Sequence, residues 1–162
     1  MNEWYKLYTE TAVRNNMTLH RKDYFLSLMG NQGKNNPGVK VNLLMAEHEG
    51  VFLSAMIMAI SRNRATYLYG ASSSSKRNLM ATYAMQWEAI KRARDDYQCT
   101  EYDMFGTAPN GHAAHPMHGL YRYKKGFGGY MYHRMGCWDY PLMNEDYRYV
   151  KALEVNNQGY RV

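Results

Sequence analysis

Cysteine and long apolar runs are both scarce in this chain of 162 residues. The two cysteines, Cys99 and Cys137, lie in unrelated contexts, so the sequence has neither a disulfide framework nor a CxxC motif. No apolar run approaches the roughly 20 residues that a membrane-spanning helix needs. The opening MNEWYKLYTE is amphipathic and contains acidic residues, which does not fit a secretory signal. We therefore expect a reduced, cytoplasmic protein whose contact with a membrane is at most peripheral.

Basic residues exceed acidic ones by 20 to 14, which gives a formal net charge of +6 and a pI near 9.2. A positive field favours acidic partners such as nucleic acid, nucleotide phosphates or an anionic membrane surface. Tyrosine is frequent, with 16 copies, and it suits both strands and the wall of a polar cleft. The apolar fraction is ordinary for a globular protein, so we expect residues 1–162 to form a single domain.

Two amphipathic helices are predicted at the start of the chain, because apolar residues recur there at helical spacing. A Gly- and Asn-rich loop follows the second helix from Gly30. The predicted buried sides carry Trp4, Leu7, Tyr8 and Val13 in the first helix, and Tyr24, Phe25, Leu28 and Met29 in the second, which starts near Lys22.

Three strands are predicted next, over residues 39–47, 51–61 and 65–71. The turns between them are so short that neighbouring strands must be antiparallel. The period then becomes helical over residues 78–95, with Leu79, Tyr83, Trp87 and Ile90 on one side. A strand over residues 100–105 completes a strand–helix–strand unit, which implies a parallel pairing through a right-handed crossover.

Beyond residue 105 the sequence predicts a loop to residue 118 and a short helix or turn over 119–125. A strand over 130–140 and a helix from Asn144 to about Asn156 follow. The predicted fold class is α/β (α+β), with a mixed, mainly antiparallel sheet and a central crossover helix. GNAT acyltransferases use this order of elements, and such a sheet can open a cleft at the start of the central helix.

The loop GASSSSKRN, residues 70–78, leads into the predicted central helix. It combines N–H groups at a helix start with serine hydroxyls and two cations, Lys76 and Arg77, which together suit a phosphate or a carboxylate. The alternative is a polar connection with an ordinary Ser or Asn cap. A GNAT enzyme that uses acyl-CoA would carry a glycine-rich turn here, and this loop has one glycine.

A second unusual segment, HGLYRYKKGFGGY from His118, interleaves Arg122, Lys124 and Lys125 with aromatic residues. A lysine held close to a carbonyl can stabilise the oxyanion that develops during aminoacyl transfer. An exposed basic turn is the alternative interpretation of the same residues.

Three histidines, His112, His115 and His118, have the spacing of metal ligands on a helical face. Pro116 argues against a continuous helix there, and no carboxylate or cysteine is close in sequence, so we expect no metal site. Asp103 either orients a group in the cleft or caps the end of its strand. Both cysteines are expected to serve packing.

Several motifs together resemble the Fem-type (FemABX) transferases, which build the interpeptide bridge of bacterial peptidoglycan. The resemblance is to the second of the family's two tandem GNAT-like domains, and the substrate cleft of the family draws on both. Three alternatives follow: a fragment, a split enzyme that needs a partner domain or chain, or a single-domain relative with a changed substrate. The motifs are YGAS from Tyr69, RNLM from Arg77, QWE from Gln86, YDMFG from Tyr102 and KKGFG from Lys124.

The resemblance implies transfer of an amino acid from aminoacyl-tRNA to an amine on the peptide stem of a lipid-linked or UDP-linked peptidoglycan precursor. It implies no metal, CoA or other cofactor. By similarity, Lys124 assists at the transition state, with Lys125 as the second candidate. The expected substrate-binding residues are Tyr67, Tyr69, Arg77, Arg21, Asp103, Tyr123 and Phe127.

Two other functions stay open on the sequence. An acyl-CoA-dependent GNAT N-acyltransferase fits the predicted fold, although the loop at residues 70–78 lacks its glycine-rich turn. A non-catalytic domain that binds tRNA or the precursor fits the positive charge.

Overall fold

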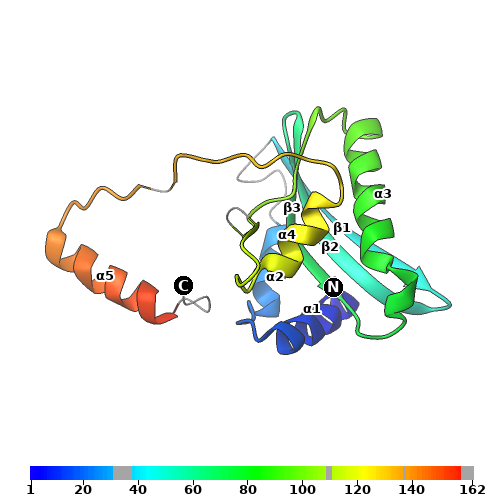
Figure 1. The fold of residues 1–162 in the computed structure, drawn as a ribbon, viewed down its shortest axis with the longest axis horizontal. Coiled ribbons are helices and arrows are strands. Elements are labelled where there is room, and N and C mark those ends of the chain that lie inside the picture. Colours follow the sequence, from blue (N-terminus) through cyan, green and yellow to red (C-terminus); the bar gives the residue numbers. More distant parts are fainter. Residues whose placement is uncertain (31–37, 109–110, 137, 158–162) are drawn as a thin grey trace. The chain divides into compact units, whose positions relative to one another are not determined.

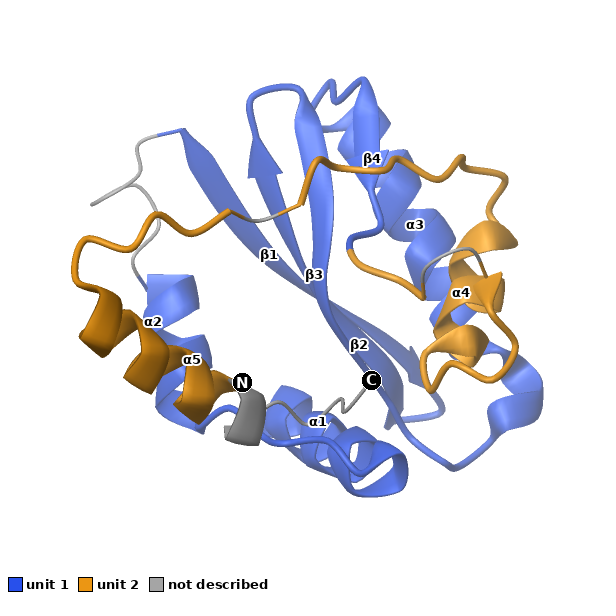
Figure 2. Ribbon diagram, turned by 60° about the vertical axis from the view of Figure 1, so that its left-hand side comes forward, with its two compact units in different colours: residues 1–105 blue, residues 106–162 orange. Residues whose placement is uncertain are grey.

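The structure is a computed structural model that describes residues 1–30, 38–108, 111–136 and 138–157. Its contacts divide the chain into two compact units, Met1–Phe105 and Gly106–Val162, which Figure 2 colours separately. Unit 1 contains the sheet, and unit 2 contains two helices. Throughout the described residues, every helix is too short or too polar to cross a bilayer.

The sheet of unit 1 has the predicted order of strands. The three strands β1 (Val39–His48), β2 (Val51–Ser61) and β3 (Arg64–Ser72) form an antiparallel meander. A 3-10 turn, η1 (Arg77–Leu79), and helix α3 (Ala81–Asp95) lead to β4 (Glu101–Asp103), which pairs in parallel with β3. The predicted meander and parallel return strand are therefore confirmed.

Helices cover both faces of this sheet (Figure 1). On one face, α1 (Asn2–Asn15) and α2 (Lys22–Gly30) place Trp4 and Phe25 against Ile57. On the other face, Met85 of α3 packs in a cluster with Met58. Strand β2 is consequently buried along most of its length, as expected for a strand covered on both sides.

The two N-terminal helices form where the periodicity predicts them. Helix α1 ends at Asn16, whose left-handed backbone (φ 51°) lets its N–H reach the carbonyls of the last turn. The buried stripe of α1 ends at Ala12, because a period of 3.6 residues leads from Tyr8 to position 12. Val13 is 76% exposed and Tyr24 of α2 is 43% exposed, so the prediction that both are buried is wrong.

Helix α3 buries a different side from the predicted one. Met80 has a left-handed backbone (φ 51°), which separates η1 from α3 and moves the start of the helix to Ala81. Tyr83 and Trp87 are 40% and 54% exposed, because small residues on another side let the helix approach the sheet closely. The side chains that face the sheet are Met85, Gln86, Ala89 and Ala93.

An extra residue in β3 changes the direction of its side chains. Tyr69 lies opposite Ile57 and Tyr67 opposite Met58, so Leu68 is the additional residue of a β-bulge. Residues two apart in a regular strand share a face. Here Tyr67 packs with the cluster under α3, whereas Tyr69 packs with the cluster under α1 and α2.

Unit 2 contains α4 (His118–Lys125) and α5 (Asn144–Asn157), close to the predicted helices. The predicted strand over residues 130–140 is wrong, because its described residues form no strand. Tyr130 and Tyr140 are 89% and 88% exposed. Apolar residues in an extended pattern do not make a strand without a neighbouring strand to pair the backbone. Cys137 lies outside the described residues.

Substituting Gly70 with alanine tests the packing around the bulge. A Cβ at Gly70 would overlap the hydroxyl and ring of Tyr67, which is packed against the α3 cluster and cannot move aside freely. We expect Gly70→Ala to lower the free energy of unfolding by about 1–3 kcal/mol, measured by urea unfolding. Gly38→Ala is the matched control, since a Cβ there meets nothing within 4 Å. Equal stability of the two variants would contradict this packing.

Candidate functional site

The sequence suggests an anion site in the loop between β3 and α3, and in the structure the backbone N–H groups of its four serines have protein acceptors. These four groups cannot bind an anion without losing a partner. The backbone N–H groups of Ser72, Ser73, Ser74 and Ser75 donate to Thr11 Oγ1 (2.8 Å), the Leu53 carbonyl (2.9 Å), Glu10 Oε1 (2.6 Å) and Ser73 Oγ (3.1 Å), respectively.

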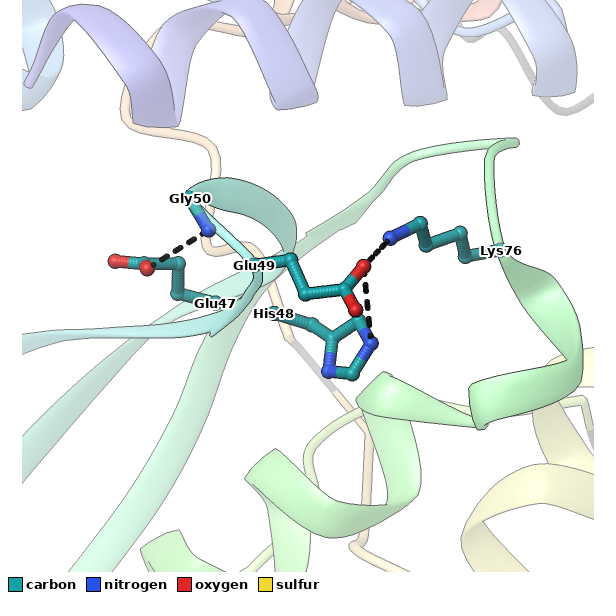
Figure 3. A network of polar contacts seen from close by, with 5 residues as sticks. All are labelled: Glu47, His48, Glu49, Gly50 and Lys76. Atoms are coloured by element: carbon teal, nitrogen blue, oxygen red, sulfur yellow. Dashed lines mark hydrogen bonds and ion pairs between the residues drawn. The ribbon is translucent and has the colours of Figure 1, made fainter.

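Lys76, the first of the two loop cations, is held by the β1–β2 turn (Figure 3). Its Nζ lies 2.5 Å from Glu49 Oε2, and His48 Nε2 lies 3.5 Å from the same oxygen. Glu47 Oε1 accepts the Gly50 N–H at 3.2 Å, which closes the turn from the other side. Lys76 is therefore engaged within unit 1.

Arg77, the second loop cation, is exposed at the start of η1 and forms no ion pair within the described parts of the chain. A third cation, Arg14 of α1, contacts the loop directly. Its guanidinium donates to the Ser72 carbonyl (2.9 Å), the Ser72 hydroxyl (2.8 Å) and the Ser74 hydroxyl (3.0 Å). Sequence reasoning missed Arg14, because it lies 58 residues from Ser72.

Tyr69 belongs to an aromatic cluster between α1, α2 and β3. Its hydroxyl lies 2.9 Å from that of Tyr24, and His20 stacks on Tyr24 with ring centroids 4.8 Å apart. Burial, followed by the hydrogen bond with Tyr24, raises the pKa of Tyr69. Arg21 adjoins this cluster, since its carbonyl accepts the Tyr24 N–H, and its exposed guanidinium lies 3.2 Å from Asp23. The structure thus brings Arg21 and Tyr69 to the same region.

Tyr67 lies on the opposite face of the sheet, in a second group of buried polar side chains. Burial raises the pKa of Tyr67 to about 12. Gln86, which is fully buried, donates from Nε2 to Tyr102 Oη at 2.6 Å. Burial likewise raises the pKa of Tyr102. Tyr67 and Tyr69 therefore do not line one wall together.

Asp103 ends β4, where its Oδ1 accepts the Phe105 N–H at 2.8 Å. Phe105 has a left-handed backbone (φ 64°), so the contact stabilises a sharp change of chain direction. This is the strand-end cap, one of the two roles that the sequence allows for Asp103.

Helix α4 holds the two candidate catalytic lysines in different surroundings. Lys124 is partly buried, and its Nζ donates to the Gly106 carbonyl at 2.5 Å. Lys125 is exposed, with its Nζ 5.6 Å from the centroid of the Tyr121 ring. The rings of Tyr123, in α4, and Phe127, in the turn after it, meet edge to face with their centroids 5.5 Å apart. Of the two lysines, Lys124 is thus the less exposed, and its ammonium is held by a backbone carbonyl.

The histidines near α4 make backbone contacts. His115 Nδ1 accepts the Met117 N–H at 3.0 Å, and His118 Nδ1 lies 3.1 Å from the Gly111 carbonyl. Within the described residues, no three His, Cys, Asp or Glu side chains are grouped to hold a metal ion. Cys99 is buried in the cluster under α3, as expected for a packing role.

The fold of this chain is GNAT-like. The solved structure of AAC(6')-Iy, in complex with the bisubstrate analogue CoA-S-monomethyl-acetylneamine, superposes with a TM-score of 0.58 and 12% identity. The match covers 86% of this chain and 90% of that one. At such low identity the similarity shows the fold alone, which is the class that the order of elements predicts.

Residues 39–155 match the FemAB family, and the chain therefore belongs to it. The lipid II:glycine glycyltransferase of Staphylococcus epidermidis is 33% identical over 109 residues, which are 67% of this chain and 26% of that protein. The protein of the same name from Staphylococcus aureus is 32% identical over 112 residues, which are 68% of this chain and 26% of that protein. The chain thus spans about a quarter of the length of these relatives.

The contact between Glu10 and Ser74 predicts a pH-dependent stability. The pKa of Glu10 is lowered, mainly by the hydrogen bond that its carboxylate accepts from the Ser74 backbone N–H. A carboxylate with a lowered pKa stabilises the fold above the unfolded-state pKa, about 4.3, and this contribution is lost as the pH falls through the folded-state pKa. We expect the wild type to exceed Glu10→Gln in stability at pH 6, by less than about 1 kcal/mol because the carboxylate is partly exposed.

Urea unfolding of both proteins between pH 3 and pH 7 measures this difference. The advantage of the wild type should vanish at the acid end of the series. Glu3→Gln on the same helix is the control, since the ion pair of Glu3 is with the exposed Lys6. A difference between wild type and Glu10→Gln that stays constant with pH would contradict the prediction.

Proposed function

We propose that this chain is the acyl-transfer part of a Fem-type aminoacyltransferase. The substrates proposed are an aminoacyl-tRNA donor and the peptide-stem amine of a lipid-linked or UDP-linked peptidoglycan precursor. The observation that carries this proposal is the family match over residues 39–155, which includes both the YGAS strand and the KKGFG turn. The relatives' name, lipid II:glycine glycyltransferase, supports a lipid-linked acceptor.

Chemically, the reaction exchanges an ester for an amide. The precursor amine attacks the ester carbonyl that links the amino acid to tRNA, and the carbonyl oxygen becomes an oxyanion. When the carbon–oxygen bond to tRNA breaks, the amine loses a proton and the tRNA hydroxyl gains one. A cation placed at the oxyanion lowers this barrier, because charge develops there only in the transition state.

Lys124 is the residue that we assign to the oxyanion. Its hydrogen bond to the Gly106 carbonyl restricts the long side chain before substrate arrives, which reduces the entropy lost in the transition state. The contact between the rings of Tyr123 and Phe127 joins the last turn of α4 to the chain that follows it and so supports the position of the helix end. Within the described parts of the chain, the Lys125 ammonium has no comparable backbone contact and lies over the Tyr121 ring.

The acceptor is proposed to approach the region of Tyr69, Tyr24 and Arg21 in unit 1. These residues combine exposed or partly exposed hydroxyl groups with an exposed guanidinium, which suits a polar, anionic precursor. Arg77 is a further exposed cation of the unit. Because the chain spans about a quarter of its relatives, we propose that a partner domain or chain completes the cleft.

An acyl-CoA donor is the second candidate, favoured by the fold shared with AAC(6')-Iy. Calorimetric titrations with UDP-linked muropeptide and with acetyl-CoA separate the two. The remaining part of a staphylococcal relative should be supplied as a separate chain. Binding of the muropeptide without acetyl-CoA is the expected result. Binding of acetyl-CoA alone would replace the proposal by a CoA-dependent acyltransferase.

Replacing Lys124 with alanine tests the catalytic assignment. We expect Lys124→Ala to lower the rate of amino acid transfer from aminoacyl-tRNA by about 100-fold or more, because it removes the cation at the oxyanion. Calorimetry should show unchanged binding of the muropeptide. Lys125→Ala, one position along the same helix, is the matched control and should stay close to the wild type. A larger loss in Lys125→Ala would move the role to Lys125, and binding without turnover in the wild type would indicate a non-catalytic domain.

A further inference from the structure

The Ser72–Ser75 loop holds a carboxylate of the protein itself. Among the acceptors of its four backbone N–H groups, only Glu10 is charged, and its contact with Ser74 is the shortest, at 2.6 Å. The same carboxylate oxygen accepts the Ser73 hydroxyl at 3.3 Å. Glu10 therefore makes the contacts that an oxygen of a bound phosphate would make with such a loop.

Arg14 fixes the hydroxyl side of the loop. Its guanidinium donates hydrogen bonds to the carbonyl and hydroxyl of Ser72 and to the hydroxyl of Ser74, while Thr11 accepts the Ser72 N–H. Glu10, Thr11 and Arg14 lie on one side of α1, at positions i, i+1 and i+4. The carboxylate is thus part of a fixed contact between helix and loop.

Glu10 is within reach of ligands from solvent. A groove of about 430 Å³ runs between α1 and the start of β2, and its lining includes Glu3, Lys6, Glu10, Phe52 and Ser73. A groove of this volume can admit a small ligand. The lining carries two carboxylates, of Glu3 and Glu10, and one ammonium, of Lys6, so the net charge of the groove is unfavourable for an anion. A small ligand can therefore reach Glu10 through the groove, but the negative charge of the lining and the occupied Ser74 N–H disfavour a phosphate.

We propose that Glu10 excludes phosphate-bearing ligands, acyl-CoA donors among them, from the Ser72–Ser75 loop, both by its negative charge and by occupying the Ser74 N–H and the Ser73 hydroxyl. Glu10 then contributes to donor specificity by weakening the binding of a competing ligand, without strengthening the binding of the preferred donor. The proposal concerns this loop alone, and its failure would leave the assignment of Lys124 and of the acceptor untouched.

The test is a titration of the full chain, labelled with 15N, with pyrophosphate and with CoA at low ionic strength. The amide signal of Ser74 is the readout, because it reports on the contact itself. The wild type should show no saturable shift of this signal. Glu10→Ala should show one with both ligands, with an affinity at least about tenfold above the wild type, as expected when a like charge in contact is removed.

Two further variants make the result decisive. Glu3→Ala removes an equal charge from the same groove without opening the loop, and should behave as the wild type. Glu10→Gln keeps an acceptor for the Ser74 N–H while removing the charge, so it carries the test if Glu10→Ala does not fold. It should bind pyrophosphate more tightly than the wild type does.

Three results would overturn the proposal. The first is a saturable shift of the Ser74 signal in the wild type. The second is the lack of such a shift in both Glu10→Ala and Glu10→Gln. The third is an equal gain in Glu3→Ala, because general charge would then explain the effect. A shift with pyrophosphate but not with CoA in Glu10→Ala would remove acyl-CoA from the excluded ligands.

Discussion

The β-bulge at Leu68 determines how unit 1 distributes its aromatic and polar residues between the two faces of the sheet. Before the bulge, Ala65 and Tyr67 pack toward α3, and after it Tyr69 and Ala71 pack toward α1 and α2. One strand therefore serves both cores, which a regular two-residue alternation would not allow. Gly70 belongs to the same arrangement, because the Tyr67 ring occupies the space that a Cβ would need. The Tyr24–Tyr69 hydroxyl pair exists only because of this change of face.

Directly beyond the bulge, the end of β3 is fastened to α1. Thr11 accepts the Ser72 N–H, Glu10 accepts that of Ser74, and Arg14 bonds the hydroxyls between them. Charge-assisted bonds to a carboxylate and a guanidinium are stronger than neutral ones, so the start of the α3 connection is held in one geometry. The serine N–H groups and Lys76 of this loop thus have partners within unit 1.

Much of this fold could be predicted from the sequence, because the signals for it are local. Turn residues and periodicity predict the meander, α1, α2 and the return strand β4 within a few residues. The errors arise where distant partners decide. Glu10 and Ser74 are 64 positions apart, so nothing near the serines indicates that their donors are taken. The buried side of α3 depends on close approach to the sheet, which favours Ala89 over Trp87 whatever their hydrophobicity. The alternation of residues in β3 likewise gives no sign of the bulge that places Tyr67 and Tyr69 on different faces.

The chemistry proposed for Lys124 makes a demand that unit 2 alone does not meet. An ammonium stabilises an oxyanion strongly only where water is excluded, since Coulomb energy falls with the local dielectric. Lys124 is only partly buried, and its hydrogen bond to the Gly106 carbonyl orients the amine without excluding water. The role proposed for Lys124 therefore requires that the substrates, unit 1 or a further domain exclude water from the lysine at the moment of reaction. The long relatives have sequence to spare for such a domain, because the matched region is about a quarter of each. On this argument, orientation of the lysine is encoded in the chain itself, and the low dielectric that gives it catalytic power depends on the complex.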